Sequence, residues 1–288
     1  NISISIDNIR DKILNQKSNI NLNKLKILHI TNFNERFDGR LHYNTSKRIN
    51  NGFIRNNHNV LNMSDRDIVY YNKSLNEIAV VNSGIENLQH CLIEKKNKRI
   101  KFLVAGTNLV ITPKDHNSII ANSLIDIIIT PSKWISDYYV SQEPKLKNRI
   151  HEWYSGINHN YWVNLKLKRE FITFYIKEND GSINDTENYI KVASKYGYGI
   201  KTIKYNKYNN KEYRRILNKS KFLIYFSNHE SQGLATAEAW SCNTPTLIWN
   251  KTFTFINGQK VKSSCCPYLS NECGKFFNNI DDFTKILD

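Results

Sequence analysis

The sequence predicts an α/β protein with two domains, each built around a parallel sheet. Short apolar runs rich in Ile, Val and Phe recur along the 288 residues, and each run is typical of a buried strand. Helix-forming segments alternate with these runs, which is the order of βαβ units. The chain is also long enough to form two hydrophobic cores of modest size.

The first domain is expected over residues 24–158, after a polar extension at residues 1–23. Residues 24–31, KLKILHIT, form a compact run that predicts the first buried strand. A helix is expected over residues 40–56, followed by a second strand over residues 58–63, which completes a βαβ unit. The inner face of that helix is expected to carry four apolar residues, Leu41, Ile49, Phe53 and Ile54.

The remainder of the first domain continues the alternation. Further strands are expected at residues 78–81, 102–105, 125–130 and 151–154. Helices are expected at residues 84–96, 119–123 and 133–140. Pro131 opens the last helix, because proline fixes φ and its missing N–H has no helical partner at that position. His29, on the first strand, is expected to be a hydrogen-bonded core residue.

The second domain is expected over residues 159–288. Its strands are predicted at residues 171–176, 200–205, 222–227 and 245–249. Its helices are predicted at residues 184–196, 211–219 and 234–241. The C-terminal helix that would cross back to the first domain is expected to be short or absent, which we interpret as a truncated C-terminal end.

The most informative segment is residues 229–240, HESQGLATAEAW, which joins a strand to a helix through a glycine turn. Glu230 and Glu238 bracket Gly233. Free N–H groups at the start of a helix bind anions, and the helix dipole favours negative charge there. Carboxylates instead accept hydrogen bonds from hydroxyl groups. Phosphate donors beside hydroxyl acceptors indicate a site for a nucleotide sugar.

This segment resembles the E-x7-E motif of retaining glycosyltransferases of family 4. Members of that family have the GT-B fold, in which two Rossmann-like domains with parallel sheets face a cleft. Residues 130–139, TPSKWISDYY, are similar to a second element of the family, and SGIN at residues 155–158 stands where N-G-V-D is usual. The resemblance covers roughly residues 24–277 and is most specific at residues 230–249.

The resemblance implies a donor site in the second domain and an acceptor site in the first. Glu230 is implied as the catalytic residue beside the donor sugar, and Glu238 as the residue that holds the ribose. The implied donor-binding residues are Glu238, Ser231, Gln232, Gly233, Leu234 and Lys177. The implied cleft residues from the first domain are Gly39, Arg40, Gly106 and Asn108.

We expect no metal and no resident cofactor, since the nucleotide sugar is itself a substrate. The one D-x-D pattern, at residues 65–67, falls away from the donor segment, and the five cysteines form no C-x-x-C pair. The adjacent Cys265 and Cys266 are expected to be free, packed thiols. Lys177 is present where the family places basic residues, but the usual arginine is not obvious, so Arg40 or backbone amides are expected to substitute for it.

Two alternatives stay open. One is a sugar-nucleotide epimerase or hydrolase on the same fold, and the other is a non-catalytic protein that binds polyanions through its net charge of +15. A dinucleotide oxidoreductase is disfavoured because no G-x-G-x-x-G follows a strand. Nucleic acid is not an expected partner, because we found no basic–aromatic clustering.

The acceptor is expected to be a glycan, a lipid or another molecule, and the basic chain suits an anionic or membrane-associated one. The sequence shows no signal peptide and no apolar run of membrane-spanning length. We therefore expect a cytoplasmic protein, with peripheral attachment to a membrane surface as an additional expectation.

Overall fold

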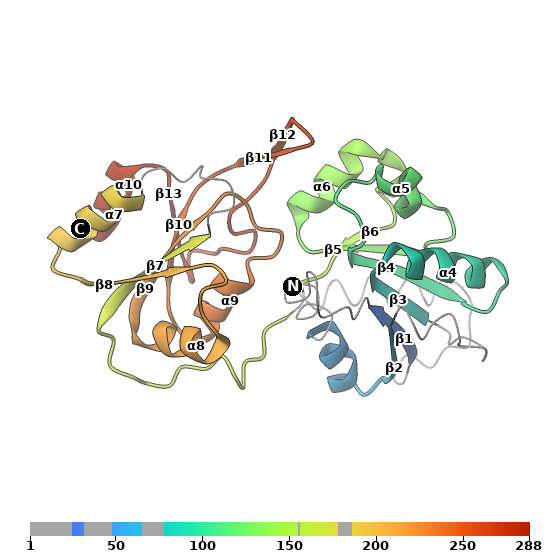
Figure 1. Ribbon diagram of the computed structural model, residues 1–288, viewed down its shortest axis with the longest axis horizontal. Coiled ribbons are helices and arrows are strands. Elements are labelled where there is room, and N and C mark those ends of the chain that lie inside the picture. The colour runs from blue at the N-terminus through green and yellow to red at the C-terminus, as the bar shows by residue number, and fades with distance from the viewer. Residues whose placement is uncertain (1–24, 32–47, 65–77, 155, 178–185) are drawn as a thin grey trace. The chain divides into compact units, whose positions relative to one another are not determined.

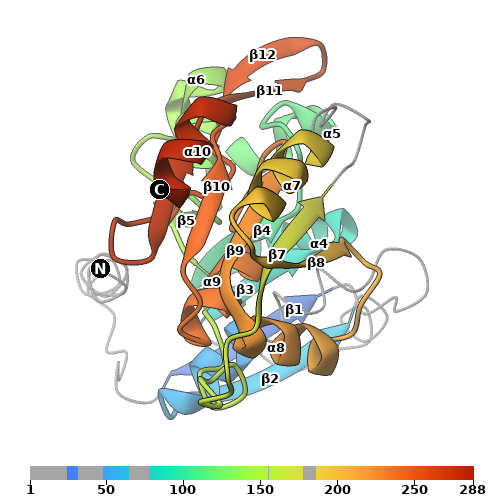
Figure 2. The same cartoon turned by 90° about the vertical axis from the view of Figure 1, so that its left-hand side faces the viewer.

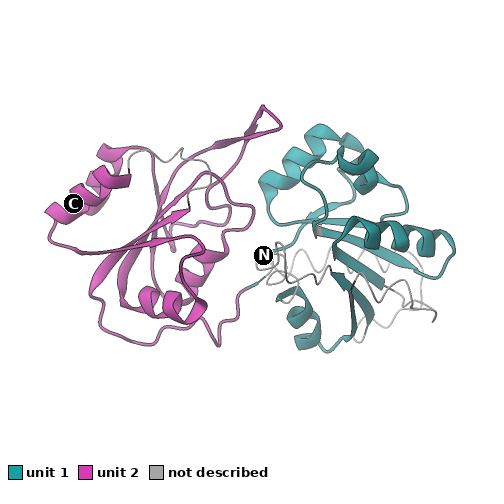
Figure 3. Cartoon of the chain, in the orientation of Figure 1, with its two compact units in different colours: residues 1–156 teal, residues 157–288 magenta. Residues whose placement is uncertain are grey.

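The computed structural model describes residues 25–31, 48–64, 78–154, 156–177 and 186–288. The chain divides into two compact units, one ending at Gly156 and the other beginning at Ile157 (Figure 3). Each unit is built around its own parallel sheet, so the predicted α/β fold class with two parallel-sheet domains is confirmed (Figure 1).

The sheet of the first unit has six parallel strands in the order β2-β1-β3-β4-β5-β6. Its strands are β1 (Lys26–Thr31), β2 (Asn59–Ser64), β3 (Ile78–Ser83), β4 (Phe102–Asn108), β5 (Ile127–Thr130) and β6 (Ile150–Glu152). The strand order reverses beside β1, because β2 lies on one side of it and all later strands lie on the other. Ligands of open α/β sheets bind at the carboxyl ends of the strands at such a reversal.

A helix over residues 48–55 covers one face of this sheet and shows why one core prediction is wrong. Ile49 and Phe53 are buried, as expected, because residues four apart lie on the same helix face. Ile54 is 54% exposed. It lies one residue further round the helix than Phe53, which turns its side chain away from the core. Leu41 lies outside the described residues.

His29 is a satisfied core residue, as predicted. Its Nδ1 donates to Asn62 Oδ1 at 3.0 Å, and its Nε2 accepts from Asn82 Nδ2 at 2.8 Å. Burial lowers the pKa of His29 to about 4, although the hydrogen bond to Asn62 acts in the opposite direction. The ring is therefore neutral, and it joins β1 to both neighbouring strands.

The helices of the first unit include α4 (Ile85–Lys96), α5 (Asp115–Ser118), the 3-10 turn η1 (Ile119–Ala121) and α6 (Lys133–Gln142). A further 3-10 turn, η2, spans Pro144–Leu146. The helix expected at residues 119–123 is thus only a short turn. Strand β4 continues past Gly106, where we expected it to end. None of the helices in the described segments has the length and hydropathy of a membrane-spanning helix.

The sheet of the second unit has five parallel strands in the order β13-β10-β9-β7-β8 (Figures 1 and 2). Its strands are β7 (Phe171–Lys177), β8 (Gly199–Lys204), β9 (Ser220–Ser227), β10 (Thr246–Trp249) and β13 (Gly274–Phe277). The order reverses between β7 and β9, because β8 lies on one side of β7 and β9, β10 and β13 follow on the other. This reversal is the predicted ligand-binding point of the second sheet.

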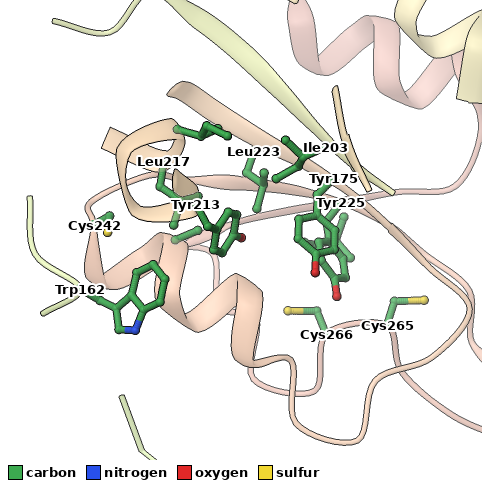
Figure 4. Close-up of a cluster of buried hydrophobic side chains, with 13 residues drawn as sticks. Trp162, Tyr175, Ile203, Tyr213, Leu217, Leu223, Tyr225, Cys242, Cys265 and Cys266 are labelled. Carbon is green, nitrogen blue, oxygen red and sulfur yellow. The ribbon is translucent and has the colours of Figure 1, made fainter. Parts of the chain in front are cut away.

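Helices cover both faces of the second sheet. They are α7 (Thr186–Lys195), α8 (Asn210–Lys219), α9 (Leu234–Ser241) and α10 (Ile280–Leu287). The core beneath α7 and α10 includes Tyr189, Phe277 and Phe283, and the core beneath α8 and α9 is shown in Figure 4. The last described helix, α10, packs against α7 of the same unit and buries Phe283 completely, so the expectation about a helix that crosses back to the first domain stays a prediction.

A two-stranded hairpin, β11 (Phe253–Ile256) and β12 (Gln259–Lys262), was missed by the sequence reading. Its turn is Asn257-Gly258, and both residues have positive φ, 49° and 77°. Asn-Gly is a strong hairpin signal, because a type I′ turn requires left-handed backbone at both positions. The Asn257-Gly258 pair could therefore have predicted this hairpin from the sequence.

Arg169 ties two helix ends of the second unit to the sheet. Its guanidinium donates to backbone carbonyls at the ends of α8 and α9 and to one hydroxyl, at 2.6–3.1 Å. These five acceptors are Leu217 O, Ser220 O, Cys242 O, Asn243 O and Thr244 Oγ1. A cation near the negative ends of two helix dipoles also gains electrostatic stabilisation.

We expect Arg169→Met to lower the free energy of unfolding of the second unit by about 3 kcal/mol, because several carbonyls lose a charged donor. Chemical denaturation followed by circular dichroism measures this change. The neighbouring Lys168 is exposed, so Lys168→Met is the matched control and should change the stability by less than about 0.5 kcal/mol. Equal effects of the two substitutions would show that the Arg169 hydrogen bonds do not stabilise the second unit.

Candidate functional site

The candidate site lies at the strand-order reversal of the second sheet. Lys177 ends β7 and pairs in register with Ser227, which ends β9. The loop of residues 228–233 follows β9 and leads into α9. Consequently the residues implied as the donor site, which are far apart in sequence, meet at one edge of the sheet.

A buried ion pair joins the two sides of this edge. Lys177 Nζ lies 2.8 Å from Glu230 Oε1, and the same oxygen accepts hydrogen bonds from Tyr225 Oη at 2.6 Å and Ser227 Oγ at 3.1 Å. Glu230 is only 7% exposed. Its backbone N–H donates to Ser264 O at 2.8 Å, which fixes the loop. The carboxylate position is therefore set by both side-chain and backbone contacts.

The charge of Lys177 is stabilised where it lies. Burial by itself lowers the pKa of Lys177, but attraction to Glu230 and the hydrogen bond between them outweigh it, so the pKa is raised. The ammonium also lies 4.9 Å from the centre of the Tyr205 ring, a favourable cation–π contact. The site thus holds one fixed positive and one fixed negative charge in direct contact.

Four tyrosines form the floor beneath Glu230. Tyr175 Oη and Tyr208 Oη are 2.6 Å apart, and Tyr213 Oη donates to the Ala235 carbonyl at 3.0 Å. Burial raises the pKa of all four phenols, so they remain neutral hydrogen-bond donors. Tyr175, Tyr213 and Tyr225 are labelled in Figure 4, and Tyr208 is the fourth. This packed aromatic layer holds the carboxylate in a region of low dielectric, which strengthens its electrostatic interactions.

Gly233 forms the turn from the loop into α9. Its φ of 72° is left-handed, a conformation that favours glycine, and a Cβ there would lie 3.0 Å from Thr236 Oγ1. No side chain at this position caps the helix, and the N–H groups of a first turn have no partners within the helix. The N-terminus of α9, beginning at Leu234, is therefore suited to an anion.

Glu238 lies on α9 and is 8% exposed. Burial raises the pKa of Tyr208, and the charges of Glu238 and Glu230 add to that rise. Both carboxylates are thus within electrostatic reach of the same phenol. In the same loop Gln232 is buried and Ser231 is half-buried. The structure therefore brings the implied donor-binding residues of the second unit into one region.

The adjacent cysteines are structural, as expected. Cys265 and Cys266 are free and buried, and burial raises the pKa of each thiol to about 12. Cys265 Sγ donates to the Ser227 carbonyl at 3.0 Å, and Cys266 Sγ lies 3.3 Å from Thr236 Oγ1. The two thiols therefore pack against the end of β9 and against α9.

A second polar cluster lies at the carboxyl ends of the strands in the first unit. The last pair in the register of β1 and β3 is Ile30 with Val81, and Thr31 and Asn82 follow these two residues directly; Asn108 pairs with Ser83. Within the part of the chain that the structure describes, several buried side-chain atoms here have no hydrogen-bond partner, namely Thr31 Oγ1, Asn82 Oδ1, Asn87 Oδ1, Asn108 Nδ2 and Ser132 Oγ. Buried polar atoms are nearly always paired, so this group indicates a place for a polar ligand.

Only part of this cluster was predicted from the sequence. Asn108 belongs to it, and Gly106 lies within β4, where a Cβ would come 2.2 Å from Asn82 Oδ1. Gly106 therefore leaves space for the Asn82 side chain. Thr31 and Asn82 were missed because each is a single polar residue at a strand end, and Ser132 because it directly precedes α6 and reads as an N-cap. The sequence carried no signal for the group, because it does not show which strands are neighbours.

Two implied cleft residues, Gly39 and Arg40, lie outside the described residues, as does the D-x-D pattern at residues 65–67. Among the residues that are described, no group of three or more His, Cys, Asp or Glu side chains forms a cluster suited to a metal ion.

No protein-family model and no curated protein matches this chain. Its structure is similar to that of the lipopolysaccharide outer core galactosyltransferase WaaB in the apo form, with a TM-score of 0.53 and 11% identity, over 91% of this chain and 88% of that chain. The chain has the GT-B fold. At this low sequence identity, the structural similarity establishes the fold alone and not the activity.

Two further solved structures are less similar. One is to the S. aureus MnaA–UDP co-structure, with a TM-score of 0.44 and 12% identity over 78% of this chain and 79% of that one. The other is to the wall teichoic acid polymerase TagF, H548A, with a TM-score of 0.41 and 10% identity over 100% of this chain and 86% of that one.

We expect Lys177→Met to lower the free energy of unfolding by about 3–5 kcal/mol, because it leaves the Glu230 carboxylate buried without its cation. Urea unfolding measures the loss, and Lys177→Met combined with Glu230→Gln should recover much of it. Lys204→Met, at an exposed lysine of β8, is the control and should be near neutral.

The pH dependence follows from the raised pKa of Lys177. Its contribution to stability is complete below about pH 10.4, the usual lysine value, and is lost as the pH rises through the higher folded value. A Lys177→Met variant as stable as the parent at neutral pH would show that the ion pair does not form.

Proposed function

We propose that this chain is a retaining glycosyltransferase that moves a sugar from a nucleotide-sugar donor to an acceptor hydroxyl. The observation that carries the proposal is the Lys177–Glu230 pair, held beside the N-terminus of α9 at the strand-order reversal of a GT-B unit. This arrangement combines an anion site with a fixed carboxylate, and both are needed to bind a sugar joined to phosphate.

The ion pair suits the charges of glycosyl transfer. When the bond between the sugar C1 and the phosphate oxygen breaks, the electron pair leaves with the diphosphate and positive charge develops on the sugar ring. Glu230 would stabilise that positive charge, and Lys177 would stabilise the negative charge on the departing phosphate. Glu230 and Lys177 lie 2.8 Å apart, and the two charges of the transition state likewise develop on neighbouring groups. Charges that are held in place before the reaction stabilise such a transition state effectively in a buried site.

The remaining donor contacts follow from the same geometry. The diphosphate would lie at the N-terminus of α9, where Gly233 and Leu234 offer backbone N–H groups, and Ser231 and Gln232 would line the approach. Glu238 would accept hydrogen bonds from the ribose hydroxyls. In this proposal the ammonium and the amides neutralise the leaving group without a metal, and Arg40 stays a predicted additional contact.

Retention requires the acceptor oxygen to attack C1 from the face that the leaving group occupies. The new bond forms between the acceptor oxygen and C1, and the hydroxyl proton passes to the departing phosphate oxygen. This route needs no further base from the chain. On this route Glu230 acts electrostatically and not as a base. The three donors that converge on its Oε1 are consistent with that role.

The acceptor would bind to the first unit. The unpaired atoms at the ends of β1, β3 and β4 belong to neutral hydroxyl and amide groups and include both donors and acceptors. A hydroxyl-rich part of an acceptor would satisfy them, with Asn108 donating from its amide. Gly106 would act indirectly, by leaving room for Asn82.

We expect Glu238→Gln to weaken binding of nucleoside diphosphates by roughly ten-fold, because a neutral amide is a weaker partner for ribose hydroxyls than a carboxylate. Calorimetry with UDP, GDP and ADP measures the affinity. Glu187→Gln, at an exposed position of α7, is the control and should leave the affinity unchanged. Unchanged affinity in Glu238→Gln would remove this residue from the site.

We expect Glu230→Gln to lower the rate of sugar transfer by roughly 100-fold or more while the chain still binds nucleoside diphosphate, because only the transition state loses a stabilising charge. Product analysis with nucleotide sugars measures transfer and its stereochemistry. An epimerised nucleotide sugar, or free sugar in the presence of acceptor, would favour the alternative enzymes. Transfer at the parent rate would remove Glu230 from the mechanism.

A further inference from the structure

The β11–β12 hairpin presents two phenylalanines and two lysines on one face. Phe253 pairs with Lys262 and Phe255 pairs with Lys260 across the two strands. Residues directly opposite one another in an antiparallel pair share a face, as do residues two apart along a strand. We call these four side chains, Phe253, Phe255, Lys260 and Lys262, the aromatic–basic face.

The opposite face attaches the hairpin to the second unit. Thr254 is buried, and its Oγ1 lies 3.0 Å from His229 Nδ1 in the donor loop. At the base of the hairpin, the Ser263 N–H donates to the Thr252 carbonyl at 2.9 Å. The hairpin is therefore held in position, and Figures 1 and 2 show it projecting beyond the strands of the second sheet.

The aromatic–basic face is exposed and carries only positive charge. Phe255 is 64% exposed, and both lysines of the face are exposed. Residues 250–264 contain three lysines, Lys251 included, and no acidic residue. Lys260 Nζ lies 4.1 Å from the centre of the Phe253 ring, and Lys251 Nζ lies 5.9 Å from it. Phe255 is thus presented to solvent on a face with two exposed lysines, while Lys251, which donates to Asn228 Oδ1 at 2.9 Å, adds a third positive charge beside Phe253.

We propose that the aromatic–basic face docks on an anionic phospholipid surface. Aromatic and aliphatic side chains enter the boundary between headgroups and acyl chains, while lysines remain among the anionic headgroups. Phe255 supplies the inserted group, and Lys251, Lys260 and Lys262 supply the attraction. Because His229 links the hairpin to the donor loop, docking would hold the second unit at the membrane.

The ring geometry favours lipid over a single-stranded nucleic acid. Binding of successive bases needs aromatic faces on which they can stack. The Phe253 and Phe255 rings meet edge to face, at 89° with centroids 5.9 Å apart, and Lys260 lies over Phe253. The hairpin does contain basic–aromatic clustering, within residues 251–262, which was missed because the hairpin itself was not predicted.

The proposal is tested by flotation of the full chain with vesicles of phosphatidylcholine, with and without phosphatidylserine. We expect binding only to the vesicles with phosphatidylserine. Replacing two lysines, Lys260→Gln with Lys262→Gln, should weaken binding by roughly 30-fold, because each lysine near an anionic surface contributes a similar share of the binding free energy. Phe255→Ser should weaken it by roughly ten-fold through lost apolar burial, and Phe255→Trp should preserve it.

Matched controls separate the hairpin from general charge and hydropathy. Lys201→Gln with Lys204→Gln removes two exposed lysines of β8, and Ile111→Ser removes an apolar side chain that is 74% exposed. Both should bind as the parent does. The proposal would be overturned if the control variants lost as much vesicle affinity as the hairpin variants. It would also be overturned if the parent bound neutral vesicles equally well, or if the hairpin variants bound as tightly as the parent. Binding to heparin or single-stranded DNA that Phe255→Ser weakens as much as vesicle binding would likewise overturn it.

Discussion

The buried contact between Lys177 and Glu230 is the constraint on which the rest of the second unit depends. A carboxylate in this position must be compensated, since an isolated buried charge is very costly. Lys177 supplies the opposite charge, while Tyr225 and Ser227 supply hydrogen bonds to the same oxygen. The tyrosine layer, the fixed loop and the start of α9 are all arranged around that oxygen.

The strand order explains how two residues more than fifty positions apart form this contact. Strands β7 and β9 are neighbours although β8 separates them in sequence, so their carboxyl ends open at the same edge. The Arg169 contacts hold the opposite ends of α8 and α9, and the buried thiols support the loop. The same arrangement places the unpaired polar atoms of Thr31 and Asn82, at the ends of β1 and β3, at the corresponding reversal of the first unit.

Local patterns predicted most of this fold, because buried parallel strands are continuous apolar runs and helices have clear boundaries. The helix over residues 234–241 was predicted with its observed limits, since Gly233 marks its start. Ile54 was misassigned because apolar character alone does not give the helix face. The ion pair could not be predicted, because it depends on which strands are neighbours. Thr31 and Asn82 were missed for the same reason.

The most direct test is a crystal structure of the chain with a bound nucleoside diphosphate. We predict phosphate oxygens within hydrogen-bond distance of Lys177 Nζ and of the Leu234 N–H, with the ribose beside Glu238. A nucleotide bound at another edge of the second sheet, with the Lys177–Glu230 pair far from both phosphates, would show that this pair does not form the donor site.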